Sequence, residues 1–308
     1  MFSIEFTPGP ILDWLSRLFY AIIGAVQDRT VDMIAPIFIG AVVFILLLER
    51  LYPAKLNQKI FSVSFFQDIS WAFFQGVGEA TVTFAWVLVL RGFYERHLDF
   101  MTVNFAPELP SWIMLVLVVI FMDFLRWLQH VIQHKVPWFW HFHVIHHSQR
   151  DLNLFTDYRY HVFEYLVRQT VYFIPLMMFG VTAMEIVWLS LFLAWHARLY
   201  HGNIKANFGP LRYLIVTPQS HRIHHSIEDR HQDRNFGAFL SIWDWIFGTQ
   251  YPGHLEYPDT GVRDETFPHE KSIGGFSLIL TPIGQMIYPF RAVGRSVSRR
   301  FSQRQAEL

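Results

Sequence analysis

The chain has 308 residues, of which 52% are hydrophobic and only 16% are charged. Its 25 Lys and Arg residues balance its 25 Asp and Glu residues, so it lacks the global basic charge that attracts nucleic acid, and we expect no nucleic-acid partner. The absence of cysteine excludes disulfide bonds, cysteine-bound zinc, thiolate-bound haem and iron–sulfur clusters. Any metal must therefore bind histidine, aspartate or glutamate, and the composition is typical of a membrane protein.

The first 29 residues, "MFSIEFTPGPILDWLSRLFYAIIGAVQDR", lack the basic region and the small-residue cleavage site of a secretory signal. We therefore treat this segment as mature sequence. It predicts a helix at the membrane surface or a first hydrophobic helix, in which Trp14 and Tyr20 are suited to the interface.

Four later regions are apolar enough to cross a bilayer, which takes about 20 such residues in a helix. In chain order they are 34–52, a stretch within 69–90, 111–129, and 162–195. The last region is too long for one span and is interrupted by "FGVTAME", so it predicts a helical hairpin. We expect an all-α integral-membrane bundle of about four transmembrane helices, including the hairpin.

The distribution of basic residues predicts the orientation. Lys55 and Lys59 follow the first span, and five arginines occupy the tail: Arg291, Arg295, Arg299, Arg300 and Arg304. By the positive-inside rule both segments face the cytoplasm, and so does the end of the third span. Residues 202–270 are rich in Pro and Gly and predict a cytosolic cap rich in histidine, while 273–290 predicts an interfacial segment. We expect N-terminal membrane helices over 1–110, a catalytic histidine-box region over 111–250, and an interfacial segment with a basic tail over 251–308.

Histidines at repeated spacings are the strongest signal in the chain. Residues three and four apart lie on one face of a helix, so each group aims its imidazoles in one direction. Neutral imidazole binds iron, zinc and copper. The groups are "HVIQH", with His130 and His134; "HVIHH", with His143, His146 and His147; and "HRIHH", with His221, His224 and His225. His141 falls outside the pattern.

Eight imidazoles exceed the roughly four to six ligands of one transition-metal ion, so two metals are implied. Hydrolytic zinc needs only three protein ligands and an open position, so the surplus argues against it. Two irons held by neutral histidines are suited to activating dioxygen beside a lipid-filled cavity. Zinc is a possible substitute in the purified protein.

Several other polar residues are candidates for supporting roles. Asp123 lies seven positions before His130, on the same helical face. It either accepts a hydrogen bond from a ligand's free ring nitrogen or pairs with Arg126 for packing, and both interpretations stay open. Asn235 and Asp244, in "NFGAFLSIWDWIFGT", are expected to support the third histidine cluster.

These segments together resemble a known family. "DFLRWLQHVIQHKVPWFWHFHVIHHS", "RYHVFEYL", "HGN", "TPQSHRIHHS" and "NFGAFLSIWDWIFGT" are similar to the fatty acid hydroxylase/sterol desaturase superfamily of integral-membrane di-iron enzymes. The resemblance covers roughly 110–250 and is nearest to the alkylglycerol monooxygenase-like and bacterial sterol-desaturase-like branches.

The resemblance implies transmembrane helices under a cytosolic histidine cap, and oxygen-dependent hydroxylation or desaturation of a lipid C–H bond. It places the family's ligands on the eight patterned histidines. A further ligand near the end of the fourth membrane region best matches His201, before Asn203, and His196 is a second candidate. "HVFE" lacks the proline of the family motif, so His161 and Glu164 are candidates for the pocket or for supporting contacts.

The chain contains no glycine-rich dinucleotide fingerprint, so we expect electrons from an external donor protein, with Arg222, Arg230 and Arg234 as a candidate docking patch. The lipid substrate is an ether lipid, a sterol or hopanoid, or an acyl chain. The rival hypothesis is a histidine-rich membrane metal-binding or transport protein. A transporter would place ionisable residues in the middle of its spans, whereas these clusters lie at span ends.

Overall fold

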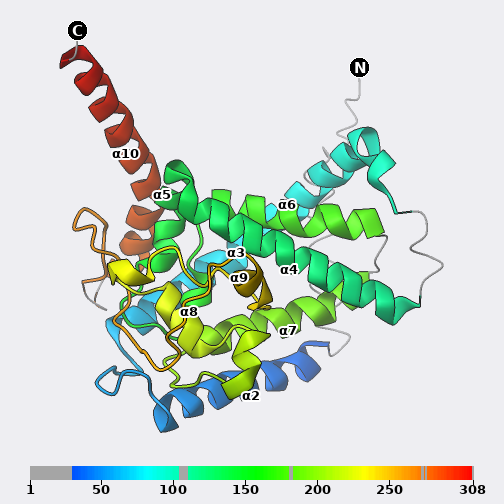
Figure 1. The fold of residues 1–308 in the computed structure, drawn as a ribbon, viewed down its shortest axis with the longest axis horizontal. Helices are drawn as coiled ribbons and strands as arrows, with labels where there is room; N and C mark the ends of the chain where they lie inside the picture. Colours follow the sequence, from blue (N-terminus) through cyan, green and yellow to red (C-terminus); the bar gives the residue numbers. More distant parts are fainter. Residues whose placement is uncertain (1–29, 104–109, 180–182, 272–273, 275, 307–308) are drawn as a thin grey trace, which may run out of the picture. The chain divides into compact units, whose positions relative to one another are not determined.

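The computed structural model describes residues 30–103, 110–179, 183–271, 274 and 276–306. The helix predicted within residues 1–29 lies outside this part. In the described part of the chain the regular elements are helices (Figure 1), and a few isolated β-bridges occur outside them. This confirms the all-α class. The α-helices are α2 (Thr30–Leu51), α3 (Val63–His97), α4 (Ser111–Lys135), α5 (Pro137–His147), α6 (Val162–Phe179), α7 (Ala183–His201), α8 (Pro218–His224), α9 (Ile242–Ile246) and α10 (Ser277–Ala306).

The chain divides into two compact units after Leu47. Most of α2 belongs to the first unit. The second unit runs from Leu48 to Leu308 and contains every candidate metal ligand.

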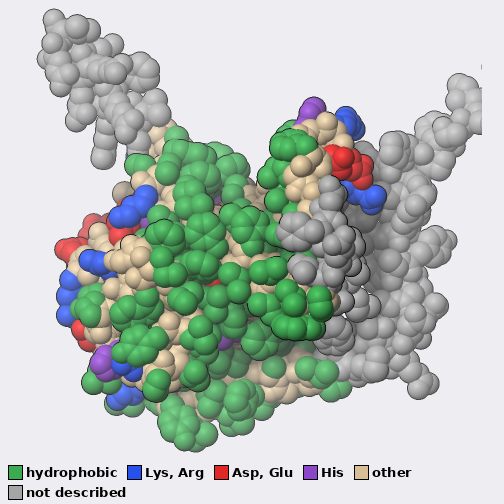
Figure 2. All heavy atoms as spheres, turned by 45° about the vertical axis from the view of Figure 1, so that its right-hand side comes forward, with side chains coloured by type: hydrophobic (Ala, Val, Ile, Leu, Met, Phe, Trp, Pro, Cys, Tyr) green, Lys and Arg blue, Asp and Glu red, His purple; other side chains and the backbone are tan. Residues whose placement is uncertain are grey.

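Helix α4 carries the clearest membrane signal. Among the described helices it is the one long and apolar enough to cross a bilayer, over Trp112–Lys135. Its inner face packs on α6 through Met114, Val118, Met122 and Leu176. Its outer face exposes large apolar side chains, namely Trp112, Val116, Leu117, Ile120, Leu128 and Ile132. Hydrophobic side chains also predominate on the face shown in Figure 2, with many of the charged ones toward its edge. Such a surface is suited to lipid; the four-span bundle stays a prediction.

A proline separates the first two histidine groups into two helices. Pro137 lacks an amide hydrogen and disfavours a helical residue before it, and Val136 is extended, with φ −96° and ψ 112°. Helix α4 therefore ends at Lys135, and α5 begins at Pro137 in the position where proline is best tolerated. The chain turns there, so the histidines of α4 and α5 face each other.

The third histidine group begins at a well-formed helix start. The Thr217 side chain accepts a hydrogen bond from the Ser220 amide, and the Ser220 side chain accepts one from the Thr217 amide. With Pro218 at the first helical position, this capping box fixes where α8 begins. The short helix then carries His221 and His224, and His225 caps its end.

A buried ion-pair cluster fastens the segment that follows α5. The Arg159 guanidinium, fully buried, donates to Asp68 on α3 and to Glu270, which precedes α10. Asp68 also accepts hydrogen bonds from Gln149 and Asn153 in the same segment. Three distant parts of the chain therefore meet immediately behind the second histidine group.

Candidate metal centre

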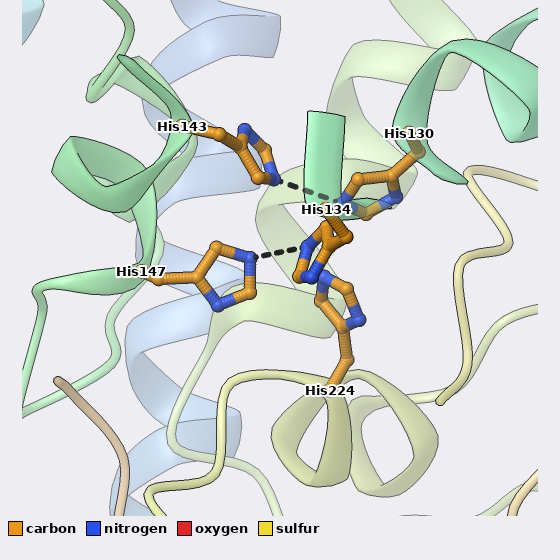
Figure 3. Close-up of side chains that lie close together, drawn as sticks. All are labelled: His130, His134, His143, His147 and His224. Atoms are coloured by element: carbon orange, nitrogen blue, oxygen red, sulfur yellow. Dashed lines mark hydrogen bonds between the residues drawn. The ribbon is translucent and has the colours of Figure 1, made fainter. Parts of the chain in front are cut away.

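Nine histidines form two adjacent groups. The five-histidine site comprises His130, His134, His143, His147 and His224 (Figure 3), and the four-histidine site comprises His146, His201, His221 and His225. Within each site the candidate ligand atoms all lie within 4.8 Å of one another. The eight patterned histidines are thus brought together, and His201 joins them.

Helices α5 and α8 each serve both sites, in opposite ways. In α5, His143 and His147 lie in the five-histidine site and His146 in the four-histidine site. In α8 the assignment is reversed, because His224 lies in the five-histidine site and His221 and His225 in the other. The repeated spacing therefore places two metal sites next to each other.

Hydrogen bonds at Nδ1 fix the tautomers of several ligands. His130 Nδ1 lies 2.8 Å from the Phe236 carbonyl oxygen, and His224 Nδ1 lies 2.8 Å from that of Arg234. A carbonyl oxygen only accepts, so each Nδ1 carries the proton and each Nε2 of the neutral ring carries a lone pair. His143 Nδ1 likewise donates to Glu164, at 2.5 Å. The Nε2 atoms of His130 and His143 lie 3.0 Å apart (Figure 3), and each carries a lone pair. The two lone pairs repel each other unless a cation lies between them.

The spacing of the nitrogens fits metal ions. Facing Nε2 atoms lie 2.8–3.2 Å apart across both sites. Bonds of about 2.1 Å to one ion place neighbouring ligand nitrogens about 3.0 Å apart in an octahedron. In addition, the buried His224 Nε2 has no hydrogen-bond partner among the described residues. The residues present therefore fit two metal ions.

One loop orients two ligands of the five-histidine site. The carbonyl groups of Arg234 and Phe236 point to His224 and His130, and Asn235 between them has a left-handed φ of 57°, which asparagine tolerates better than most residues. Buried Asp244 fixes this loop by accepting from the amides of Phe236 and Gly237, at 2.9 and 2.8 Å. Asp244 therefore acts on His130 through the backbone.

We expect Asp244→Ala to lower metal affinity at the five-histidine site about 10- to 100-fold, the usual cost of removing a partner that orients a ligand. Chelator competition on the purified protein would measure it. Asp229→Ala is the matched control, because Asp229 is exposed and pairs with Arg263 in the cap. Equal metal retention in both variants would contradict this role of Asp244.

Glu164 connects a ligand to the neighbouring helix. Its Oε1 accepts from His143 Nδ1 and from Gln133 Nε2, at 2.5 and 2.7 Å. A carboxylate at this position holds the imidazole in one orientation and makes Nε2 a stronger donor to a metal.

The two histidines of α7 have different surroundings. His201 Nδ1 donates to the Ala197 carbonyl at 2.8 Å, and its Nε2 lies 3.2 Å from that of His146. His196 lies against Tyr200 and Phe239 instead, outside both sites. Their separation by five residues places them on different sides of the helix.

Burial keeps the ligand imidazoles neutral. Together with the charges that neighbouring histidines would carry, it lowers the pKa of His146, His147, His221 and His225 well below 6.5 and that of His224 to about 3. Neutral rings are the form that binds metal.

This gives a pH dependence for the metal-free protein. Below pH 6.5, the ordinary pKa of histidine, the unfolded chain binds protons that the folded chain does not. Stability is therefore present above that value and is lost as pH falls, by up to about 1.4 kcal/mol per pH unit for each such imidazole. Thermal unfolding of chelated protein in detergent, from about pH 7.5 to about pH 5, checks the sign. A constant or rising unfolding temperature on acidification would contradict it.

Known proteins support the same assignment. Residues 115–249 match the family model described as fatty acid hydroxylase. The matched region contains both histidine sites. Ornithine lipid hydroxylase OlsE of Rhizobium tropici is 26% identical over 84% of this chain and 76% of its own length. Alkylglycerol monooxygenase of Homo sapiens is 34% identical over 41% of this chain and 28% of its own, and that of Xenopus tropicalis is 33% identical over 42% and 29%.

These relatives are hydroxylases and monooxygenases, which confirms the expected family and the expectation of an oxidoreductase. The chain spans less than a third of the length of the alkylglycerol monooxygenases. No solved structure matches the chain.

The other residues predicted to support the site lie outside the two groups of clustered histidines. Both Asp123 oxygens accept hydrogen bonds from the loop after Gly237, so Asp123 holds that loop rather than a ring nitrogen. Asn203 accepts from the Lys55 amide and donates to its carbonyl. His161 accepts from the Phe163 amide, and its Nε2 lies 3.2 Å from the Met286 carbonyl.

Of the three arginines in the expected docking patch, Arg222 is the one that is buried. Its side chain is buried, with 2% exposure, and its Nε donates to the Pro258 carbonyl. Arg230 is exposed but pairs with Glu228 and Glu256. The prediction of one basic patch from all three arginines is wrong, because α8 turns Arg222 inward.

Two hollows flank the histidines. One, of about 50 Å³, is lined by ligands of both sites and by residues of α4, α6 and α7. The other, of about 400 Å³, opens on the cap side next to His134, His147 and His224. The first is the candidate substrate cavity because both metal sites border it.

Sequence reasoning missed the groups that act through the backbone. The carbonyls of Arg234, Phe236 and Ala197 orient ligands. Every residue has a backbone carbonyl, so the residue type does not show which of them act in this way. Gln133 was also missed, although its place inside "HVIQH" was a usable signal.

Proposed function

We propose that this protein is a membrane-bound di-iron oxygenase that hydroxylates, or desaturates, a C–H bond of a lipid, using O2 and electrons from an external donor protein. The observation that carries the proposal is the pair of adjacent, wholly imidazole sites at the end of an apolar helix. Imidazole without thiolate suits iron, and a hydroxylase domain supplies the context.

The five-histidine and four-histidine sites would each hold one iron, which when bound supplies activation of O2 and oxidation of the C–H bond. The protein's own residues bind and orient. Glu164 and the 234–237 loop hold the imidazoles, and burial of the ligand rings excludes bulk water.

The substrate class proposed is a membrane lipid, which the exposed apolar surface of α4 supports. The relatives act, by their names, on an ornithine lipid and on alkylglycerols, so an ether lipid or another lipid with a polar head fits best, ahead of a sterol or hopanoid. We also propose a multi-pass topology with the histidines facing the cytoplasm, and the three regions divided near residues 110 and 250.

Metal content and oxygen incorporation test the proposal together. Protein expressed with added iron and purified in detergent should contain about two iron ions per chain. Membranes containing it should transfer one labelled oxygen atom from 18O2 to a lipid when reductant is supplied, as detected by mass spectrometry. One loosely held zinc ion and no labelled or desaturated lipid would instead favour the metal-transport hypothesis.

A further inference from the structure

The substrate cavity contains two arginines that no metal-binding role explains. Arg126 on α4 and Arg168 on α6 line it together with ligand imidazoles of both sites. Guanidinium groups are poor metal ligands but strong, often bidentate, donors to carboxylate and phosphate. Their presence beside the metal sites therefore calls for a separate explanation.

Arg126 forms no ion pair or hydrogen bond with the described residues; its guanidinium lies over the Tyr172 ring, 5.4 Å from the centroid. The nearest carboxylate in sequence is already engaged, because Asp123 Oδ1 accepts from the Phe239 amide and Oδ2 from the Leu240 amide and Trp243 Nε1, each at 3.0 Å. A half-buried cation without a hydrogen-bonded anion is costly. An anionic ligand would remove that cost.

Arg168 brings a second positive charge to the same cavity. Its guanidinium lies 4.6 Å from the centroid of Tyr160, another lining residue. Among the lining residues Glu164 is the one carboxylate, and its Oε1 is occupied by His143 and Gln133. Two guanidinium groups therefore border the cavity beside the metal ligands.

We infer that the cavity binds an anionic group of the lipid substrate, a carboxylate or a phosphate, through Arg126 and Arg168. This inference rests on the proposed function and narrows its substrate class. Because the arginines and the metal ligands line the same small cavity, the oxidised carbon lies close to the anionic group rather than at the far end of an acyl chain.

Two matched lipid pairs test the inference in iron-loaded protein in nanodiscs. N-oleoylglycine is compared with its neutral methyl ester, and 1-oleoyl lysophosphatidic acid with neutral 1-monooleoylglycerol. Binding is measured by lipid competition in metal-free and in iron-loaded protein, and turnover by product analysis. We expect one anionic lipid to bind about 10- to 100-fold more tightly than its neutral partner, the range for hydrogen bonds to a charged group. The preferred pair distinguishes a carboxylate from a phosphate.

The variants Arg126→Gln and Arg168→Gln should each lose most of this preference, because binding of the anionic lipid weakens more than binding of its neutral partner. Arg126→Lys should keep part of it, since the charge remains but the planar donors do not. Arg91→Gln is the control, because Arg91 is exposed on α3 and pairs with Glu95.

Equal binding of anionic and neutral lipids by the wild type, or a preference that both glutamine variants retain, would overturn the inference. The two proposals fail separately. Anion-selective binding without oxidation of any lipid supports the anion site and counts against the oxygenase. Oxidation of lipids without anion selectivity supports the oxygenase and counts against the anion site.

Discussion

Replacement of His143 by alanine is expected to remove at least one iron ion per chain and to reduce lipid oxidation by more than about 100-fold, beyond the cost of losing a supporting partner. His143 contributes to the five-histidine site and is fixed by Glu164. His146→Ala should have an effect of similar size through the four-histidine site. Metal analysis and product formation measure the two variants.

His141→Ala provides a control from the same helix. His141 lies in α5 but belongs to neither histidine group, so its removal should leave metal content and oxidation near those of the wild type. If His143→Ala or His146→Ala matched this control in both measurements, the assignment of two metal sites would fail.

Arg159→Met should destabilise the protein by about 3–5 kcal/mol, the range for breaking a buried ion pair by removing one partner. The variant leaves the carboxylates of Asp68 and Glu270 buried without their shared cation. Gln149 and Asn153, which also bind Asp68, follow the second histidine group directly. Thermal or denaturant unfolding in detergent would show the loss, and metal retention should fall with it.

Arg91→Met removes an arginine from an exposed ion pair with Glu95 and should change stability little, since such pairs are screened by solvent. Comparable unfolding of the two variants would show that the Arg159 cluster is not a stabilising element.

The sequence predicted the helical class and the grouping of the histidines because both depend on local periodicity. Three- and four-residue spacing places imidazoles on one helix face whatever the surrounding fold. Which histidine belongs to which metal site depends on how α4, α5, α7 and α8 pack, and no spacing rule contains that information.

The supporting residues show where sequence reasoning ends. Asp244 was expected to support the third histidine group. It holds the 234–237 loop, whose carbonyls contact His224 of that group and also His130 of the first. Asp123 was considered for a ring nitrogen or for Arg126, and its oxygens accept hydrogen bonds from the Phe239 and Leu240 amides and from Trp243. Asp123 binds amides 116 and 117 residues away, and Asp244 binds amides seven and eight residues away. A backbone amide is present at almost every residue, so residue type does not reveal either pairing.

The shared use of α5 and α8 has a consequence for how the protein acquires its metals. Each of these short helices carries ligands of both sites, so an ion bound in one site fixes the helices that the other site requires. The first ion to bind then offsets the entropy lost on ordering these helices, and the second ion binds to helices that are already ordered. Metal uptake is therefore cooperative. If metal-free protein receives half of the iron needed to fill both sites, most molecules should carry either two ions or none, and few should carry a single ion.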